Sequence, residues 1–244
     1  MKRLAKLLAV LPLLAATVLT TITLSAAPAS AASCYGFSRT LSQGASGEDV
    51  RQLQIRVSGY PGYGAVLAID GQFGAGTKAA VTRFQQAYGL AADGVAGAAT
   101  FSKLSSLEDS DCTPVNFSYA ELNRCNGDWS GGAVSAATAK SNALVTMWKL
   151  QAMRHALGDR PIVVNGGFRS VACNNAVGGA AGSRHLYGDA ADLGAGTIGF
   201  CKLAQQARNH GFNEILGPGY PDHNDHTHVA NRSGRFWSAP SCGI

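Results

Sequence analysis

Residues 183–192 read Ser-Arg-His-Leu-Tyr-Gly-Asp-Ala-Ala-Asp, and residues 223–228 read His-Asn-Asp-His-Thr-His. Zinc in hydrolases binds three protein ligands, drawn from imidazole and carboxylate, and keeps a fourth position open. His185, Asp192 and one histidine of the second stretch supply such a set. Three of the six histidines of the chain lie in residues 223–228, and this density favours a metal site over histidines that cap loops or hydrogen-bond in a core.

These two stretches also predict how the surrounding chain folds. Residues 190–193 have the composition of a strand that carries Asp192. Residues 226–230 predict a second strand, in which a period of two places His226 and His228 on the same face. The remaining predicted elements are two short strands, at residues 161–165 and 214–216, and two helices, at residues 135–157 and 198–210. Because these strands show no regular alternation with helices, we expect an α+β domain on an antiparallel sheet.

Arg169 follows the predicted strand at residues 161–165 and is a candidate for a binding cleft. A guanidinium binds a carboxylate through two parallel hydrogen bonds, which suits a substrate that ends in a free carboxyl group. The alternative is a surface arginine in a solvent-exposed ion pair.

Residues 1–31 begin with three basic residues, continue through an apolar stretch and end in Ala-Ser-Ala. This pattern predicts a secretory signal peptide that is cleaved after Ala31. A membrane anchor and a lipid-anchored Cys34 are alternatives, but the threonines of the apolar stretch and the small residues before Cys34 favour cleavage. We therefore expect a secreted, extracellular protein without membrane contact after cleavage.

Charge and cysteine content restrict the partners and the compartment. Residues 1–31 contain three of the 20 basic residues and none of the 15 acidic ones, so the remainder has a formal net charge of +2. Because the sequence has no concentrated basic patch, we expect no nucleic-acid partner. We also expect the protein to be a monomer. All six cysteines follow residue 31 and form no Cys-x-x-Cys pair, which predicts three disulfides in an oxidising compartment. Fifteen pairings are open, and a bridge between Cys34 and Cys112 would close the first domain.

A doubled pattern marks that first domain. Residues 70–77 and 93–100 share the form Asp-Gly-x-x-Gly-x-x-Thr, in which Asp-Gly predicts a turn with positive φ and the threonine lies near a helix start. Apolar residues at helical spacing between and before the two copies predict a three-helix unit. Polar residues 107–116 read as a linker. A helical spacer without a ligand is the alternative to a binding domain.

Residues 70–100 resemble the peptidoglycan-binding domain found beside many cell-wall hydrolases. The resemblance implies that residues 32–110 are a peptidoglycan-binding domain, which precedes a catalytic domain at residues 113–244, and that the exported protein is extracellular or associated with the cell wall.

Residues 113–244 resemble the zinc D-alanyl-D-alanine carboxypeptidases, the metallo DD-peptidases of bacterial cell walls. The family's Ser-x-His-x-x-x-x-x-x-Asp motif falls on residues 183–192, and its third metal ligand is the last histidine of residues 223–228. The implied zinc ligands are His185, Asp192 and His228. The implied catalytic and substrate-binding residues are Asp225 as acid and base, His223, Arg169 and Ser183, with His226 as a neighbour of the site. The resemblance also implies the disulfides Cys34–Cys112, Cys125–Cys173 and Cys201–Cys242.

The resemblance implies hydrolysis of the terminal D-Ala-D-Ala bond of peptidoglycan stem peptides, with one zinc ion per chain. Zinc with two neutral histidines and one aspartate keeps a net positive charge, which lowers the pKa of a bound water and polarises the scissile carbonyl. Asp225 would take the proton of this water and return it to the leaving amine. His223 or Arg169 would stabilise the oxyanion.

Three alternative functions can be compared with the motifs of the chain. Serine DD-peptidases require Ser-x-x-Lys and Lys-Thr-Gly, and neither occurs in the chain. An endopeptidase of the same fold, which would cut the L-alanyl-D-glutamate or the cross-bridge bond, would use the same zinc ligands and stays open. A non-enzymatic wall-binding protein is disfavoured by the complete set of ligands and base.

Overall fold

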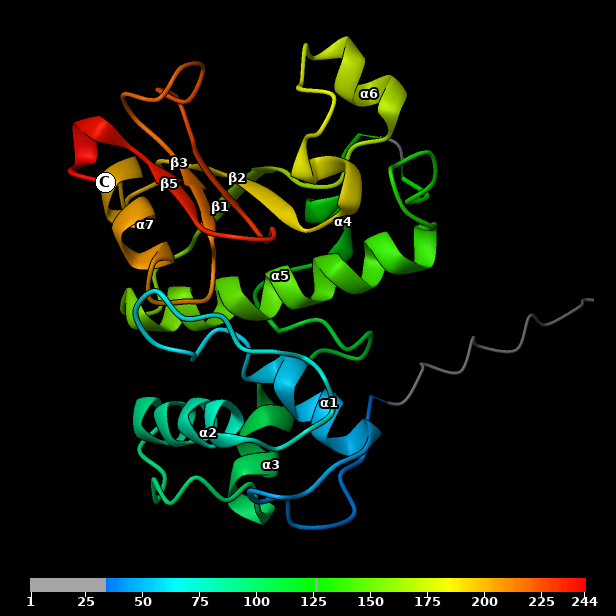
Figure 1. The fold of residues 1–244 in the computed structure, drawn as a ribbon, viewed down its shortest axis with the longest axis vertical. Coiled ribbons are helices and arrows are strands. Elements are labelled where there is room, and N and C mark those ends of the chain that lie inside the picture. The colour runs from blue at the N-terminus through cyan, green and yellow to red at the C-terminus, as the bar shows by residue number, and fades with distance from the viewer. Residues whose placement is uncertain (1–33, 126) are drawn as a thin grey trace, which may run out of the picture. The chain divides into compact units, whose positions relative to one another are not determined.

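The computed structural model describes residues 34–125 and 127–244 (Figure 1). The expected signal peptide lies outside these residues. Helices α1 (Glu48–Arg56), α2 (Ala75–Ala87) and α3 (Ala98–Ser106) form a helical domain. They share one apolar core, which confirms the predicted three-helix unit. The largest fully buried side chains of this core are Leu41, Leu53, Phe73, Phe84 and Leu104.

A buried glutamine explains the first copy of the doubled pattern. Gln54 of α1 is 1% exposed, and its Nε2 donates to Asp70 Oδ1 at 2.9 Å and to Thr77 Oγ1 at 3.0 Å. Its Oε1 accepts the backbone N–H of Gly71 at 2.8 Å. Gly71 has a φ of +73°, which glycine adopts without strain. The aspartate, glycine and threonine of the pattern therefore all bind one side chain.

The second copy repeats this arrangement around Gln85 of α2. Its Nε2 donates to Asp93 Oδ1 at 2.9 Å and to Thr100 Oγ1 at 3.2 Å, and its Oε1 accepts the N–H of Gly94 at 2.9 Å. A buried amide without partners costs about 1–3 kcal/mol, so each glutamine requires its complete set of partners. The doubled pattern is a structural device that the domain uses twice. The sequence pattern predicted the two loops but not the glutamines that they bind.

Helix α5 (Ala136–Ala156) lies between the helical domain and the sheet. It begins as predicted at Ser135, whose Oγ accepts the N–H of Thr138 at 3.2 Å. Its apolar face packs beneath the sheet through Met147, Leu150 and Met153. Ala152 packs into the core of the helical domain instead, so α5 joins both cores. None of the described helices is long and apolar enough to cross a membrane.

One five-stranded sheet, of order β1-β2-β4-β3-β5, carries the second core. Its strands are β1 (Val163–Gly166), β2 (Ala190–Gly194), β3 (Glu214–Leu216), β4 (Thr227–Ala230) and β5 (Phe236–Ser238). The expected purely antiparallel sheet is wrong in one respect, because β5 pairs with β3 in parallel. The chain leaves β4 and places β5 beyond β3 at the edge; since β3 and β5 are both opposite in direction to β4, they run parallel.

Helices flank the sheet. Helix α7 (Phe200–Ala207) packs on β4, and α5 packs on β2. The remaining helices of the described residues are α4 (Tyr119–Leu122), α6 (Val171–Ala176), η1 (Arg184–Tyr187) and η2 (Pro240–Cys242). The side chains that face α5 and α7 are apolar and buried; they include Ala191, Leu193, Ile215 and Val229. Because side chains alternate along a strand, Asp192 and His228 point to the opposite face.

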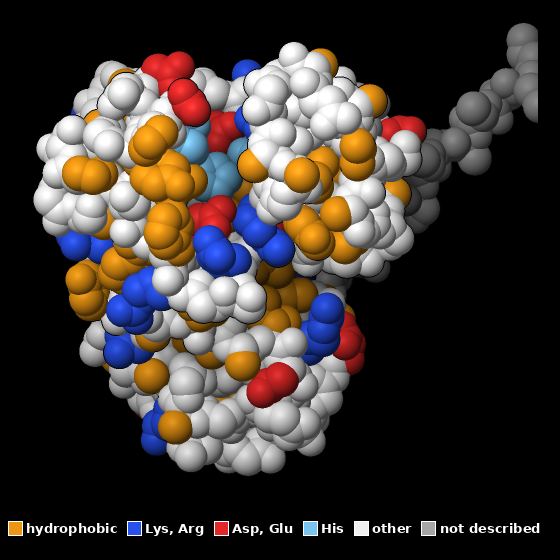
Figure 2. Space-filling view, turned by 45° about the horizontal axis from the view of Figure 1, so that its top comes forward, with side chains coloured by type: hydrophobic (Ala, Val, Ile, Leu, Met, Phe, Trp, Pro, Cys, Tyr) orange, Lys and Arg blue, Asp and Glu red, His pale blue; other side chains and the backbone are white. Residues whose placement is uncertain are grey.

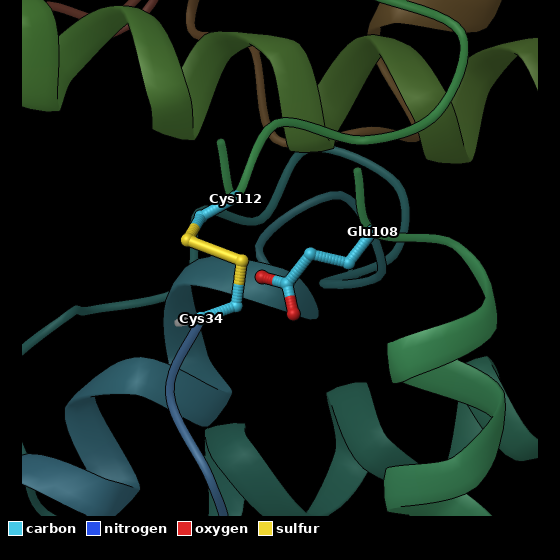
Figure 3. Close-up of side chains that lie close together, drawn as sticks. All are labelled: Cys34, Glu108 and Cys112. Carbon is cyan, nitrogen blue, oxygen red and sulfur yellow. A yellow bond between two sulfur atoms is a disulfide. The ribbon is translucent and has the colours of Figure 1, made fainter. Parts of the chain in front are cut away.

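The described residues contain three disulfides, and these are the pairs that the family resemblance implied: Cys34–Cys112, Cys125–Cys173 and Cys201–Cys242. The first lies beside the carboxylate of Glu108 (Figure 3). This group of two cysteines and a carboxylate is no metal site, because its sulfur atoms are bonded to each other. Glu108 instead forms a buried ion pair with Arg56 of α1.

Candidate metal centre

Two strands and one short helix bring His185, Asp192 and His228 together. Asp192 of β2 lies directly opposite His228 of β4 in the antiparallel register, and His185 comes from η1. His185 Nε2 lies 3.0 Å from Asp192 Oδ1 and 3.2 Å from His228 Nδ1, and His228 Nδ1 lies 2.9 Å from Asp192 Oδ1. A tetrahedral ion bound at about 2.0–2.1 Å holds its ligand atoms roughly 3.3 Å apart. The three atoms therefore fit the spacing that zinc requires.

The backbone orients His185. Its Nδ1 donates to the carbonyl of Gly167 at 2.5 Å, so the proton of the neutral ring sits on Nδ1 and Nε2 is left as the ligand atom. Gly167 must be glycine, because a Cβ there would lie 2.4 Å from the carbonyl oxygen of Leu122. Gly188, with a φ of +74°, ends η1 against α5, where a Cβ would lie 2.3 Å from the carbonyl oxygen of Ala139.

A carboxylate orients His228. Its Nε2 lies 3.2 Å from Glu214 Oε1, and Glu214 Oε2 accepts a hydrogen bond from Arg232 Nη1 at 2.7 Å. The ring therefore presents Nδ1 to the cluster. The sequence-based prediction missed Glu214; its only signal was an acidic residue at the start of a predicted short strand.

The electrostatics of the cluster favour a cation. Burial acts to raise the pKa of Asp192, but His185 and His228 outweigh it and hold this pKa well below its usual value. Burial lowers the pKa of His185, which keeps that ring neutral. Burial also acts to lower the pKa of His228, but hydrogen bonds to Asp192 and Glu214 raise it overall, to about 9. A positive charge between the two carboxylates, a proton or a metal ion, is therefore stabilised.

Arg169, Ser183 and His223 line one cleft with the cluster, as do the apolar side chains of Val177 and Phe236. The cleft has a volume of about 650 Å³. Figure 2 shows histidines at the bottom of this hollow, with acidic and basic side chains around them and hydrophobic ones on both sides. The cleft thus offers charged groups for a polar substrate and apolar walls for small side chains.

Arg169 and His223 contact different parts of the site. Arg169 Nη2 lies 2.5 Å from Asp192 Oδ2, so the guanidinium touches the ligand cluster itself. His223 Nδ1 lies 2.6 Å from the carbonyl oxygen of Pro221, and its ring centre lies 4.7 Å from that of His226. Burial lowers the pKa of His223, which favours its neutral form.

Asp225 lies outside the ligand cluster. Its side chain is 89% exposed, and its Oδ1 accepts a hydrogen bond from His226 Nδ1 at 2.8 Å. The other ring nitrogen of His226 lies 3.6 Å from Asp192 Oδ1. The structure therefore places His226, which the family resemblance left as a neighbour of the site, between Asp225 and the ligands. The sequence pattern that indicated this position was the period of two, which placed His226 and His228 on the same face of a predicted strand.

Comparison with known proteins matches both parts of the chain. Residues 115–230 match the family Peptidase M15, and residues 46–104 match a putative peptidoglycan-binding domain. The zinc D-Ala-D-Ala carboxypeptidase of Streptomyces albus G is 79% identical over 211 residues, which cover 86% of this chain and 83% of that protein.

Other matches cover about a third of the chain. The spore cortex-lytic enzyme of Bacillus cereus is 41% identical over 78 residues, which are 32% of this chain and 29% of that enzyme. The SleB N-terminal domain, known from a crystal structure, is 43% identical in sequence. The match covers 29% of this chain and 93% of that domain, with a TM-score of 0.26.

Fold, site and matches together define a zinc-dependent peptidase with an appended peptidoglycan-binding domain. The chain belongs to the zinc D-Ala-D-Ala carboxypeptidases of the Peptidase M15 family.

Proposed function

We propose that the chain is a secreted enzyme that removes the terminal D-alanine from peptidoglycan stem peptides ending in D-Ala-D-Ala. The observation that carries this proposal is the convergence of His185 Nε2, Asp192 Oδ1 and His228 Nδ1 within 3.2 Å of one another at the bottom of an open cleft. The 79% identity to a carboxypeptidase of that name supports the substrate.

These three residues would hold one zinc ion per chain. Zinc supplies Lewis-acid polarisation and a nucleophile at neutral pH when it is bound in such a set. The chain prepares the set, because hydrogen bonds to Gly167 and Glu214 leave one defined ring nitrogen of each histidine for the metal.

Asp225 carries the proton transfer in this proposal, and its contact with His226 supports a role for this exposed carboxylate at a buried site. The carboxylate holds His226 Nδ1 at 2.8 Å, which turns Nε2 toward the ligands. Asp225 would accept a proton released in the cleft, directly or through this imidazole, and would return it to the leaving amine of D-alanine.

Arg169, His223 and Ser183 would bind and orient the substrate. Arginine has five N–H donors, so the contact of Arg169 with Asp192 leaves donors for the terminal carboxylate of the peptide. His223 lines the same cleft. Because Nδ1 of its neutral ring already donates to the carbonyl of Pro221, His223 would donate to the oxyanion only as the protonated ring. Such a contact is typically worth about 3–4 kcal/mol in the transition state.

The other parts of the chain bring the enzyme to its substrate in this proposal. Residues 1–31 direct export, residues 32–110 bind peptidoglycan, and residues 113–244 form the catalytic domain. The enzyme acts as a monomer outside the membrane. The three disulfides suit an oxidising compartment.

Product analysis tests the substrate. The full chain without residues 1–31 is loaded with zinc and incubated with a stem pentapeptide ending in D-Ala-D-Ala, and the products are identified by mass spectrometry. We expect free D-alanine and a tetrapeptide. Cleavage at the L-alanyl-D-glutamate bond or at a cross-bridge, with the terminal dipeptide intact, would show an endopeptidase and refute the proposal.

A further inference from the structure

Glu214 is a buried carboxylate beside the ligand cluster. It begins β3 and is 9% exposed. In the antiparallel pairing of β3 with β4, Glu214 lies opposite Ala230 and Leu216 lies opposite His228. Two residues along a strand return a side chain to the same face, so Glu214 and His228 share the face that carries the cleft.

The two nitrogens of His228 meet two different carboxylates. Nδ1 lies 2.9 Å from Asp192 Oδ1, inside the cluster, and Nε2 lies 3.2 Å from Glu214 Oε1, behind it. A neutral imidazole carries one proton, and the hydrogen bond at one nitrogen decides which nitrogen remains a ligand. The second oxygen of Glu214 is held by Arg232 at 2.7 Å, so the carboxylate is itself fixed in place.

We propose that Glu214 is a positioning residue of the metal centre. It accepts the Nε2–H of His228, which selects the tautomer with Nδ1 free, and it holds the ring so that Nδ1 faces Asp192 and His185. His185 is oriented in the same way by a backbone carbonyl, that of Gly167. Of the two histidine ligands, His228 is the one oriented by a carboxylate, which also makes that ring a stronger ligand. The proposal rests on the proposed zinc site.

Zinc affinity tests this role without any peptide substrate. The zinc dissociation constants of the wild type, Glu214→Ala and Glu214→Gln are measured by competition with a chromogenic chelator. We expect a loss of about 10- to 100-fold for Glu214→Ala. Glu214→Gln should lose less, because its amide oxygen still accepts the hydrogen bond but carries no charge.

Asp222→Asn is the matched control. Asp222 lines the same cleft and has a φ of +60°, a conformation that asparagine tolerates. This variant removes one negative charge from the cleft without removing a contact to a metal ligand. Its zinc affinity should equal that of the wild type, so a general effect of cleft charge is separated from positioning.

Long-range ¹H–¹⁵N NMR of the zinc-loaded protein reads the Nε2–H of His228 directly. Zinc on Nδ1 keeps this proton on Nε2 in every variant, so we expect a hydrogen-bonded Nε2–H signal in the wild type and a shifted, faster-exchanging one in Glu214→Ala. Unchanged zinc affinity in both Glu214 variants would overturn the proposal, even if the metal-free protein melts earlier, and so would an Nε2–H signal that is the same in the wild type and in Glu214→Ala. Weakened zinc binding in an enzyme that does not release D-alanine would support Glu214 while refuting the proposed substrate.

Discussion

Gly59 offers a direct test of how α5 joins the two cores. A Cβ at this position would lie 2.4 Å from Ala152 Cβ and 3.0 Å from Lys149 Cα. Carbon atoms in contact are normally about 3.5–4.0 Å apart, so Gly59→Ala forces α5 away from the helical domain by roughly an ångström. Such overpacking costs about 1–3 kcal/mol. In a chain of this size, that loss lowers the melting temperature by about 2–4 °C for each kcal/mol.

Gly76→Ala is a control with the opposite expected sign. Gly76 lies in the first turn of α2, and a Cβ there would meet only Leu67 Cδ1, at 3.8 Å. Alanine is favoured over glycine in a helix by up to about 1 kcal/mol, so this variant should melt slightly above the wild type. The same type of substitution therefore destabilises at Gly59 and stabilises at Gly76, and the difference is a packing effect.

The double variant Gly59→Ala, Ala152→Gly completes the experiment. It removes the 2.4 Å contact, so part of the stability should return even though Ala152→Gly alone costs about 1 kcal/mol in a helix. Unfolding is followed by circular dichroism, and a coupling energy of roughly 1 kcal/mol or more is expected between the two sites. A Gly59→Ala variant that melts at or above the wild-type temperature would refute the close packing of Gly59 on α5, and so would strictly additive effects.

Three further predictions concern the site and its surroundings. Asp192→Ala should lose both zinc and turnover, whereas Asp225→Asn should keep about one zinc per chain and lose roughly a hundredfold in turnover; metal analysis beside kinetics decides, and a zinc-free Asp225→Asn protein would remove Asp225 from its role. Chelators should abolish the activity and β-lactams should leave it intact, because the chain lacks the serine motifs; covalent, stoichiometric inhibition by penicillin would contradict the zinc mechanism. Burial lowers the pKa of His210, whose Nδ1 donates to the carbonyl of Gly59 at 2.8 Å, so the stability that neutral His210 contributes is complete above the ordinary pKa of 6.5 and is lost as the pH falls below it. Between pH 7 and pH 5, the melting temperature of zinc-loaded His210→Gln should therefore fall less than that of the wild type, and a parallel fall in both proteins would contradict this assignment.

Short sequence patterns predicted most residues of the candidate metal centre. The spacing of Ser183, His185 and Asp192, and the histidines near His228, predicted a metal centre because ligand chemistry requires particular side chains on short, defined segments. Period two placed His226 and His228 on one face of a predicted strand, and helical spacing predicted the three helices of the first domain. The resemblance to metallo DD-peptidases added the identity of the third ligand and the disulfide pairs, which spacing alone left open.

Only the tertiary structure decided the partners of these groups. Gln54 and Gln85 bind loops that follow them by up to 23 residues, and no local rule assigns a glutamine to a distant turn. Glu214 reaches His228 because β3 pairs with β4 in one particular register, and β5 runs parallel because it lies beyond β3 at the sheet edge. Sequence periodicity determines which face of a strand a side chain occupies, but the neighbour across the sheet depends on non-local pairing. The candidate ligand residues could therefore be predicted from the sequence, whereas the groups that orient them are set by the packing of the whole chain.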